Sequence, residues 1–507
     1  MASALSIQSV VAVVGAGAMG AGIAQVASAA GHTVRLLDNR VGAAAQAIDG
    51  IRAQFDKMAA KGKITATAAQ ANGARLFVAH ELSDLADAAL VIEAIVESLP
   101  VKQQLFRDLE AVVLDTCILS TNTSSISITA IGAALQNPQR LAGLHFFNPA
   151  PLMALVEVVS GLATDTQVTD VLFATAIAWG KTPVSAKSTP GFIVNRVARP
   201  YYAEALRVLT EGGADCATLD ACCREAGGFR MGPFELMDLI GHDVNFAVTR
   251  SVWNAFFNDP RFLPALVQQE LVDAGFLGKK SGRGFYQYTT GAAKPAPATE
   301  AAQAVPQDIV IYGQSGAAQA LAERLSARQV VFTQAAGQGD AFASAAGATL
   351  YVTDGRTATR RSSDTQTPDT VLVDLALDYA RAARLAISVA AQCNPAASRS
   401  AIGLLQAAGF AVSTLRDIPG LIVMRTVAML SNEAADAVNQ GVCDVQGVDT
   451  AMRLGLNYPC GPLAWANAVG IPTISTVLTH LAQTYGEDRY RTSPLIQHQL
   501  YAAKAFS

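Results

Sequence analysis

The sequence predicts an α/β domain around a doubly wound parallel sheet, then an all-α domain, and then a reduced copy of each. The first sign is an apolar run at Val10–Val14 that leads through a glycine-rich loop into an Ala-rich segment. Beyond Pro190 the pattern changes to long helical segments without buried strands. The third sign is that the segment Pro190–Arg196 recurs in similar form at Pro419–Arg425.

Length and composition limit the class of protein. At roughly 150 residues per domain, 507 residues correspond to about three domains or more, and 51% hydrophobic residues are enough for large cores. The net charge of −4 argues against a nucleic-acid partner held by bulk charge. The seven cysteines include no C-x-x-C pair, which predicts a reduced, intracellular protein, and we expect no metal site.

The first 34 residues contain no Asp, Glu, Lys or Arg, so a membrane or secreted location has to be weighed. A signal peptide needs a basic start, which is absent here. The stretch is rich in Ala, Gly and Val, and its recurring glycines are more typical of a phosphate-binding loop than of a bilayer span. We therefore expect a cytoplasmic protein without a membrane partner.

The amino-terminal residues have the pattern of one βαβ unit. Val10–Val14 predicts a buried strand, residues 21–30 a helix that ends at Gly31, and Thr33–Asp38 the next strand. Such a unit begins a Rossmann-like, doubly wound sheet. We expect helical structure over residues 42–75 and further buried strands at 89–93, 117–121, 141–146 and 154–159.

Three glycines form a G-x-G-x-x-G pattern directly after the first predicted strand. Gly15 permits a tight turn, Gly17 lets the backbone approach a pyrophosphate, and Gly20 lets the helix pack closely on the strand. The start of the helix then offers N–H groups to the phosphates. Asp38, at the end of the second strand, suits ribose hydroxyls and disfavours a 2′-phosphate, which predicts NAD as the cofactor, although Arg40 lies nearby.

The second half of the chain repeats the first with a constant offset of 229 positions, from 190 to 419 and, for Met231–Phe234 and Cys460–Leu463, from 231 to 460. The stretch between the copies lacks the complete glycine pattern, so we expect a degenerate Rossmann-like domain that binds no dinucleotide. The predicted division is an NAD-binding Rossmann domain at 1–188, a helical domain at 189–288, a linker at 289–306, a degenerate domain at 307–416 and a second helical domain at 417–507.

Two ionisable side chains interrupt apolar strands of the first domain. His145 stands at the end of the predicted strand 141–146, where open α/β sheets bind their ligands. Glu157 interrupts the run Leu155–Val159, and a buried carboxylate there needs a partner, which a neighbouring imidazole would supply. The alternatives are a hydrogen-bonded core histidine and a glutamate that faces water from an edge strand.

Hydroxyl and amide side chains complete the set of candidates. Ser124 follows a predicted strand, where its hydroxyl either caps a helix or stands beside His145 at the sheet edge. Asn195 interrupts an apolar segment, and the second copy has Met424 in its place. An amide that only one copy needs favours a chemical role over a packing role.

Five motifs occur in order along the first 200 residues: Gly15-x-Gly17-x-x-Gly20, Val91–Glu97, Ser120–Ser125, His145–Pro149 and Pro190–Arg196. Together they resemble the L-3-hydroxyacyl-CoA dehydrogenase family. The resemblance covers residues 6–288 densely, and the tandem second half is similar to the longer bacterial members.

The resemblance implies a role for each matching position. His145 matches the general base and Glu157 the carboxylate that orients it, while two further residues, Ser124 and Asn195, match those that hold the substrate oxygen and assist the base. The other matches are contacts to cofactor or substrate: Asp38 to the ribose, Glu97 and Lys102 to the nicotinamide end, and, loosely, Lys61 to coenzyme A. The second copy departs from the family pattern at Met424 and in its glycine loop, so no second active site is expected.

The reaction that the resemblance implies is oxidation of an (S)-3-hydroxyacyl-CoA to the 3-oxoacyl-CoA by NAD, in phenylacetate or fatty-acid catabolism, with a 3-hydroxyadipyl or 3-hydroxybutyryl thioester as substrate. Small members dimerise through the helical domain, so the tandem copy is expected to supply that contact within one chain, and a homo-oligomer stays open. A dehydrogenase of a free hydroxy acid and a non-catalytic NAD-binding scaffold are the alternatives.

Overall fold

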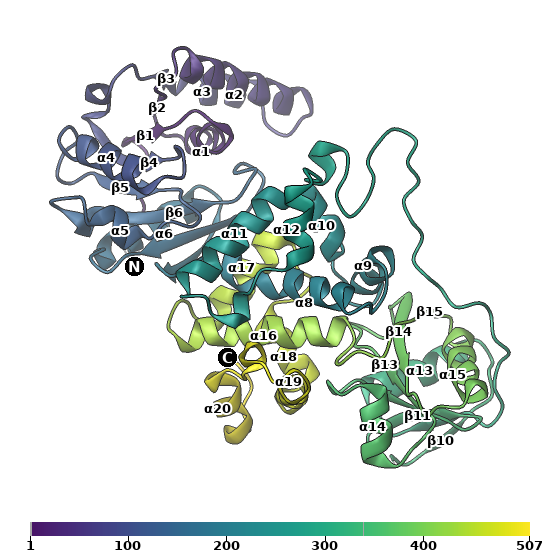
Figure 1. Ribbon diagram of the computed structural model, residues 1–507. Coiled ribbons are helices and arrows are strands. Elements are labelled where there is room, and N and C mark those ends of the chain that lie inside the picture. Colours follow the sequence, from purple (N-terminus) through teal and green to yellow (C-terminus); the bar gives the residue numbers. More distant parts are fainter. Residues whose placement is uncertain (1–2, 338) are drawn as a thin grey trace. The chain divides into compact units, whose positions relative to one another are not determined.

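The structure is a computed structural model that describes residues 3–337 and 339–507. The chain folds into two compact units (Figure 1). Unit 1 contains the residues up to Arg196 together with Gln440–Leu456, and unit 2 contains Val197–Asn439 and Asn457–Ser507. The predicted fold class is confirmed, because an α/β domain and helical segments are each followed by a second, similar set.

Unit 1 is built on one eight-stranded sheet in the order β3-β2-β1-β4-β5-β6-β7-β8. All neighbouring strands are parallel except β6 and β7, which run antiparallel. The chain order reverses between β1 and β4, and doubly wound sheets bind ligands at such a switch point. The strands are β1 (Val10–Val14), β2 (Val34–Leu37), β3 (Leu76–Val78), β4 (Ala88–Glu93), β5 (Ile118–Thr121), β6 (Leu141–Phe146), β7 (Leu155–Ser160) and β8 (Thr182–Lys187).

The helices of this part of the chain differ from the prediction in one respect. The expected helical stretch 42–75 is two helices, because Gly62 adopts a left-handed φ of +67° and the hydroxyl of Thr65 caps the second helix. The sequence did not indicate β3, which has three residues, or β8, which has no continuous apolar run. The helices are α1 (Ala18–Ala29), α2 (Ala43–Ala60), α3 (Ala66–Ala74), α4 (Leu99–Glu110), α5 (Ile128–Gly132), α6 (Thr166–Ala178) and α7 (Val194–Val197).

Unit 2 contains both helical copies except for one helix of the second copy. The first copy consists of α8 (Arg199–Thr210), α9 (Cys216–Glu225), α10 (Pro233–Ile240), α11 (His242–Ala255) and α12 (Leu266–Asp273). The second copy contributes α16 (Val423–Asn439), α18 (Pro462–Val469), α19 (Ile471–Tyr485) and α20 (Pro494–Ala502).

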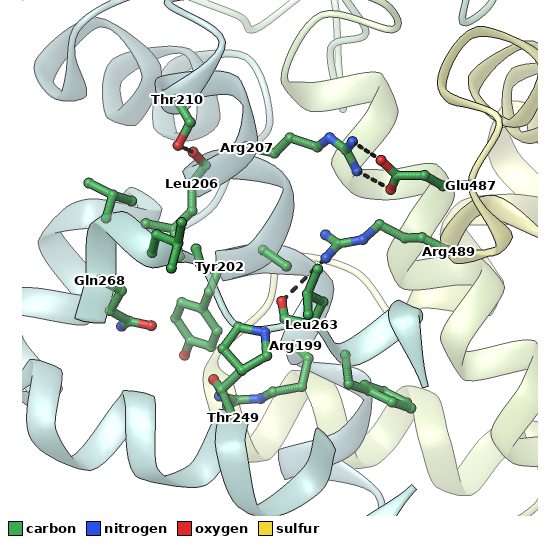
Figure 2. Close-up of a pocket in the computed structure, with 16 residues that line it drawn as sticks. Arg199, Tyr202, Leu206, Arg207, Thr210, Thr249, Leu263, Gln268, Glu487 and Arg489 are labelled. Carbon is green, nitrogen blue, oxygen red and sulfur yellow. Dashed lines mark hydrogen bonds and ion pairs between the residues drawn. The ribbon is translucent and has the colours of Figure 1, made fainter. Parts of the chain in front are cut away.

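Ion pairs join the two helical copies within unit 2. Nε of Arg425, in the second copy, donates to Glu204 of α8 over 2.7 Å, and both side chains are buried. Figure 2 shows both guanidinium ends of Arg207 facing the two carboxylate oxygens of Glu487, beside a cavity of about 220 Å³. One ion pair between the copies, Arg425–Glu204, is therefore buried, and the other, Arg207–Glu487, lies nearer the surface.

The reduced α/β domain of unit 2 has a seven-stranded sheet in the order β10-β9-β11-β12-β13-β14-β15. Ala336 follows β10 directly, in the place that Asp38 takes after β2. The strands are β9 (Val310–Tyr312), β10 (Thr333–Ala335), β11 (Ala341–Ala345), β12 (Ala348–Val352), β13 (Thr370–Val373), β14 (Arg384–Val389) and β15 (Ala411–Thr414), and the helices are α13 (Gly316–Ala327), α14 (Ala358–Thr365) and α15 (Pro395–Ala407).

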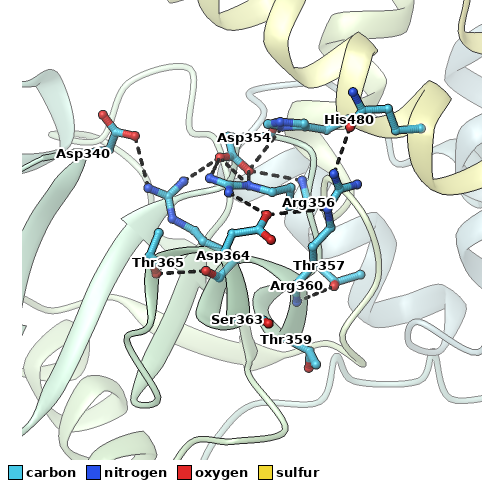
Figure 3. Close-up of polar contacts among 12 residues, drawn as sticks. Asp340, Asp354, Arg356, Thr357, Thr359, Arg360, Ser363, Asp364, Thr365 and His480 are labelled. Atoms are coloured by element: carbon cyan, nitrogen blue, oxygen red, sulfur yellow. Dashed lines mark hydrogen bonds and ion pairs between the residues drawn. The ribbon is translucent and has the colours of Figure 1, made fainter.

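A polar cluster connects this reduced domain to the second helical copy (Figure 3). The Asp354 carboxylate, after β12, accepts hydrogen bonds from Arg356 and Arg361. Nδ1 of His480, on α19, lies 2.8 Å from the backbone oxygen of Asp354. The three charged side chains thus hold in place the loop that α19 contacts.

The two copies exchange one helix each. Helix α9 of the first copy packs on β14 of the reduced domain, within unit 2. Its counterpart 229 positions later, α17 (Val445–Leu456), packs on β7 and β8 of the first domain, within unit 1. Residues of the second copy therefore complete the cover of the first sheet.

Three structural absences hold for the described residues. Within them, no helix combines the length and apolar character required of a membrane span. The same residues contain no group of His, Cys, Asp or Glu side chains arranged to hold a metal ion. The seven cysteines, all of which lie in the described ranges, are free thiols.

The contact of α17 with unit 1 can be tested at Gly455. A Cβ atom at this position would lie 2.8 Å from Leu155 of β7 and 3.1 Å from Val194. Gly455→Val should therefore lower the free energy of unfolding of unit 1 by about 1–3 kcal/mol through overpacking. Urea denaturation measures this effect, and Arg453→Ala, an exposed position on the same helix, is the control. Equal stability of the two variants would contradict the packing described.

Candidate active site

The glycine-rich loop between β1 and α1 forms a cradle that side chains would fill. A Cβ atom on Gly20 would lie 1.7 Å from the backbone oxygen of Gly15, and one on Gly15, whose φ is +106°, would lie 2.4 Å from the oxygen of Ala94. A Cβ atom on Gly17 would meet nothing within 4 Å, so the loop is open to a ligand at that residue. No side chain caps α1, which leaves its first N–H groups available to a pyrophosphate.

Asp38 lies directly beside this loop. Its Oδ2 accepts a hydrogen bond of 2.7 Å from the N–H of Ala16, and its Oδ1 accepts one of 3.0 Å from Nε of Arg40. The hydrogen bond from the Arg40 side chain is the main reason that the pKa of Asp38 falls to about 2. The loop and Asp38 line a cavity of about 1210 Å³, which offers room for a dinucleotide.

His145 and Glu157 lie opposite each other on the antiparallel strands β6 and β7. Nδ1 of His145 lies 2.6 Å from Oε2 of Glu157, and both side chains are buried. β7 is an interior strand covered by β8, so the alternative in which Glu157 faces water from an edge strand is wrong. The ring centroids of Phe147 and His145 lie 4.5 Å apart, so Phe147 packs against the imidazole.

The second oxygen of Glu157 reaches the segment that carries Asn195. Oε1 accepts hydrogen bonds from the N–H groups of Ile193, at 3.1 Å, and Val194, at 3.0 Å. Nδ2 of Asn195 donates to the backbone oxygen of Ser124 over 3.4 Å. The structure therefore links the four residues that the sequence selected for the chemistry: His145 contacts Glu157, Glu157 holds the segment before Asn195, and Asn195 contacts the backbone of Ser124.

Comparisons with known proteins decide the family. Residues 10–189 match the family described as 3-hydroxyacyl-CoA dehydrogenase, NAD binding domain, and residues 191–288 and 420–506 match its C-terminal domain. Residues 350–419 match the 3-hydroxybutyryl-CoA dehydrogenase reduced Rossmann-fold domain. The chain belongs to the 3-hydroxyacyl-CoA dehydrogenase family.

Individual relatives agree with this assignment. The 3-hydroxyadipyl-CoA dehydrogenase of Escherichia coli (strain K12) is 46% identical over 505 residues, which are 96% of this chain and 97% of the relative. The mitochondrial hydroxyacyl-coenzyme A dehydrogenase of Sus scrofa is 41% identical over 288 residues, 55% of this chain and 90% of the relative. A solved structure of 3-hydroxybutyryl-CoA dehydrogenase from Escherichia coli superposes with a TM-score of 0.89 at 45% identity, and covers 98% of this chain and 99% of that chain.

These comparisons confirm the resemblance, the fold class, the enzyme class and the NAD cofactor predicted from the sequence. The chain is an NAD-dependent 3-hydroxyacyl-CoA dehydrogenase. The duplication is confirmed as well, because one C-terminal domain description matches two separate segments. The roles of individual site residues stay predictions.

Glu97 and Lys102 belong to one charge network beside the loop of Ser124, in which Lys102 is buried and Glu97 is exposed. Oε1 of Glu97 accepts hydrogen bonds from the hydroxyl of Thr123 and the N–H of Ser124. Burial alone would raise the pKa of Glu97, but the Thr123 hydrogen bond and the charge of Lys102 outweigh it, so the pKa lies below its usual value. Lys102 is 1% exposed and pairs with Glu93 as well, so we expect it to act on the site through Glu97.

The sequence did not single out two residues that support this edge of the sheet. Glu93 ends β4 and accepts hydrogen bonds from Lys102 Nζ and from the hydroxyl of Thr121. Oδ1 of Asn122 accepts a hydrogen bond of 2.8 Å from the N–H of Phe146. This bond fixes the end of β6, the strand that carries His145. A carboxylate in an otherwise apolar strand was a usable signal for Glu93, as it was for Glu157.

A second cavity of unit 1, of about 860 Å³, is lined by α1, α2 and the loop after β6. Lys63 lines it, whereas Lys61 is an exposed residue at the end of α2 that does not line the cavity. The buried ammonium of Lys181 also lines it and donates to the backbone oxygens of Ala150 and Met153. The role of Lys61 in holding coenzyme A therefore stays a prediction, to which the structure adds Lys63 and Lys181 as candidates.

The assignment of Asp38 to the ribose can be tested by cofactor preference. Asp38→Asn removes the negative charge and frees Arg40 to meet a 2′-phosphate. The KM for NAD should rise by roughly ten-fold, and turnover with NADP should become measurable.

Steady-state kinetics with both cofactors check this prediction. Asp56→Asn, an exposed change on α2, is the matched control and should behave as wild type. An Asp38→Asn enzyme with an unchanged preference for NAD would remove Asp38 from cofactor selection.

Proposed function

We propose that this dehydrogenase oxidises the 3-hydroxyl of an acyl-CoA with His145 as the general base, and that a 3-hydroxyadipyl thioester is its preferred substrate. The observation that supports the base most strongly is the 2.6 Å contact between Nδ1 of His145 and Glu157. A carboxylate accepts hydrogen bonds, so it holds the ring proton on Nδ1 and leaves Nε2 free to accept a proton.

In the proposed step, Nε2 of His145 takes the proton of the substrate's 3-hydroxyl. The imidazolium that forms is stabilised by Glu157, whose charge is already in place and has little freedom to reorient. A positioned base of this kind contributes about 10²–10⁴ in rate. When bound, NAD⁺ accepts the hydride that leaves C3 of the substrate.

Ser124 and Asn195 are the proposed holders of the substrate oxygen. Asn195 donates to the backbone of Ser124, so the two side chains come from facing segments of one site. A hydroxyl and an amide next to the base can hold the oxygen at the distance at which the base acts. The same pair limits the positions that the reacting carbon can take.

The residues around the glycine loop fit NAD. The cradle at Gly15, Gly17 and Gly20 has room for a pyrophosphate only because no Cβ atoms occupy it. Asp38 would bind the adenosine ribose. Val96, which precedes Glu97, lines the same cavity, and we expect the nicotinamide on that side. The coenzyme A moiety would lie along the groove lined by Lys63 and Lys181, whose positive charges suit its phosphates.

Similarity favours the six-carbon dicarboxylic acyl group. The relative that matches 96% of this chain is named 3-hydroxyadipyl-CoA dehydrogenase, and it shares the tandem second half. A structure with a TM-score of 0.89 is titled 3-hydroxybutyryl-CoA dehydrogenase, so the four-carbon thioester is the second candidate. Either substrate belongs to phenylacetate or fatty-acid catabolism, and the free cysteines suit the proposed cytoplasmic location.

Replacement of His145 tests the base. In His145→Ala, kcat should fall by about 10²–10⁴ while the affinity for NAD, measured by calorimetry, stays within a factor of two or so, because the ring faces the substrate. His498→Ala, at an exposed histidine of α20, should keep the wild-type rate. A His145→Ala enzyme with normal turnover would exclude this mechanism.

Substrate preference can be read from NADH formation with a series of thioesters. The kcat/KM for 3-hydroxyadipyl-CoA should exceed that for 3-hydroxybutyryl-CoA by roughly ten-fold or more, the value of one charge-assisted contact to the distal carboxylate. Free 3-hydroxy acids should not react. Faster oxidation of a free acid than of its thioester would favour the hydroxy-acid alternative, and the absence of turnover with every substrate would favour the scaffold.

A further inference from the structure

The cavity of about 220 Å³ in unit 2 lies between the two helical copies (Figure 2). The first copy lines it with α8, with Thr249 of α11 and with residues 262–268, and the second copy adds Glu487 and Arg489. It shares no lining residue with the two cavities described in unit 1. A molecule bound in this cavity would therefore contact both helical copies and would lie outside the proposed NAD and coenzyme A sites.

The ionisable side chains that line this cavity are mostly cationic. Three arginines, Arg199, Arg207 and Arg489, line it together with one carboxylate, Glu487. That carboxylate is already engaged, because both of its oxygens accept hydrogen bonds from Arg207. Burial lowers the pKa of Arg199, and an anion bound beside it would oppose this shift. The charge of the lining therefore favours an anionic ligand.

Arg489 is the cation whose hydrogen bonds are incomplete. Its side chain is buried, at 5% exposed, yet within the described residues its guanidinium donates one hydrogen bond, from Nη2 to the backbone oxygen of Leu263 over 3.3 Å (Figure 2). Nε has no hydrogen-bond partner there, and Nη1 lies 3.8 Å from Oε1 of Glu204, beyond hydrogen-bond distance. A guanidinium has five N–H donors, and leaving buried donors without acceptors is costly.

Arg425, from the same helical copy, shows how a buried guanidinium of this unit is satisfied by the protein alone. Its Nε donates to Glu204 over 2.7 Å, Nη1 to the hydroxyl of Tyr485 over 3.1 Å and Nη2 to the hydroxyl of Tyr490 over 2.6 Å. Arg425 does not line the cavity, whereas Arg489 does. The contrast indicates that the acceptor missing at Arg489 is one that a ligand in the cavity can supply.

The size and the apolar walls of the cavity limit the kind of anion. Leu206 and Phe262 line it as buried side chains, and Leu263 and Leu266 line it from more exposed positions. These walls favour a ligand with a hydrocarbon part over inorganic phosphate. The volume of about 220 Å³ equals that of about seven molecules of liquid water, which is too small for a nucleotide.

We propose that this cavity binds a small aliphatic carboxylic acid of about four to six carbons, with its carboxylate on Arg489 and its chain against Leu206 and Leu263. Such an acid has about six to eight non-hydrogen atoms, which matches the volume. Its carboxylate forms charge-assisted hydrogen bonds with the guanidinium. Because both helical copies line the site, the bound acid stabilises the contact between them. No residue of the proposed chemistry takes part, so binding does not depend on the proposed function.

Calorimetric titration of the full chain saturated with NAD tests the site with butanoate, hexanoate, octanoate and inorganic phosphate. Butanoate and hexanoate should bind with a Kd of about 0.1–1 mM, and phosphate at least about ten-fold more weakly, because it gains nothing from the apolar walls. Octanoate exceeds the cavity and should bind more weakly than hexanoate. Hexanoate at about ten times its Kd should raise the thermal midpoint of unit 2 by roughly 2–5 °C.

Two variants locate the binding. Arg489→Gln should weaken hexanoate at least about ten-fold while kcat stays within about two-fold of wild type, and Leu266→Glu, at an exposed lining position, should weaken it about five-fold or more by repulsion. Arg381→Gln and Val331→Glu, at exposed positions of unit 2 outside the cavity, are the matched controls and should bind as wild type does.

Wild-type affinity in Arg489→Gln or in Leu266→Glu would place the acid elsewhere, for example in the substrate site, and would overturn the proposal. No binding of any acid by the wild-type enzyme would overturn it as well. Equal affinities for phosphate and hexanoate, or an affinity that keeps rising from hexanoate to octanoate, would contradict the class of ligand proposed.

Discussion

A single carboxylate, that of Glu157, joins the three parts of the active site. It is fixed by the pairing of β6 with β7, it contacts Nδ1 of His145, and it accepts the N–H groups that begin the segment of Asn195. Each hydrogen bond restricts the carboxylate further, so the imidazole cannot rotate without disturbing the turn. The proposed base, the amide proposed to assist it and the strand pair are therefore held in one arrangement.

The duplicated half differs at the positions that correspond to the candidate site residues. At the offset of 229 positions, Asp374 stands for His145, Ala386 for Glu157 and Met424 for Asn195, and the Asp374 carboxylate accepts the N–H groups of Val423 and Met424. The exchanged helices α9 and α17 add a structural use for the second copy, because α17 packs on the strand that carries Glu157. The second half thus contributes packing to the first sheet, and we expect no second active site in it.

Much of the site could be predicted because a polar residue within an apolar strand sequence is buried on folding and therefore needs a partner. Glu157 within five residues of apolar strand had to have a partner, and His145 at a neighbouring strand end supplied it. Asn195 was recognisable because the duplicated copy has Met424, which served as an internal comparison. The glycine loop was recognisable because only glycine fits at Gly15 and Gly20.

Other features depend on contacts between distant segments, which no local pattern encodes. Lys102 has the sequence context of an exposed helical lysine, yet Glu93 and Glu97 enclose it. The helix exchange is a set of contacts between segments far apart in the sequence. The offset of 229 positions shows the duplication but does not predict which sheet each helix contacts. The same holds for Asp374, directly after β13, whose carboxylate accepts hydrogen bonds from the N–H groups of Ile422 and Val423, 48 and 49 positions away.

The most direct test of this account is the protonation state of the His145 ring in the free enzyme at neutral pH. Nitrogen-15 NMR of histidine-labelled protein, with the His145→Ala variant to assign the signals, distinguishes the two ring nitrogens. We expect the Glu157 carboxylate to keep the ring proton on Nδ1 rather than Nε2, and this preference to be lost in Glu157→Gln. A proton found on Nε2 in the wild-type enzyme would contradict it.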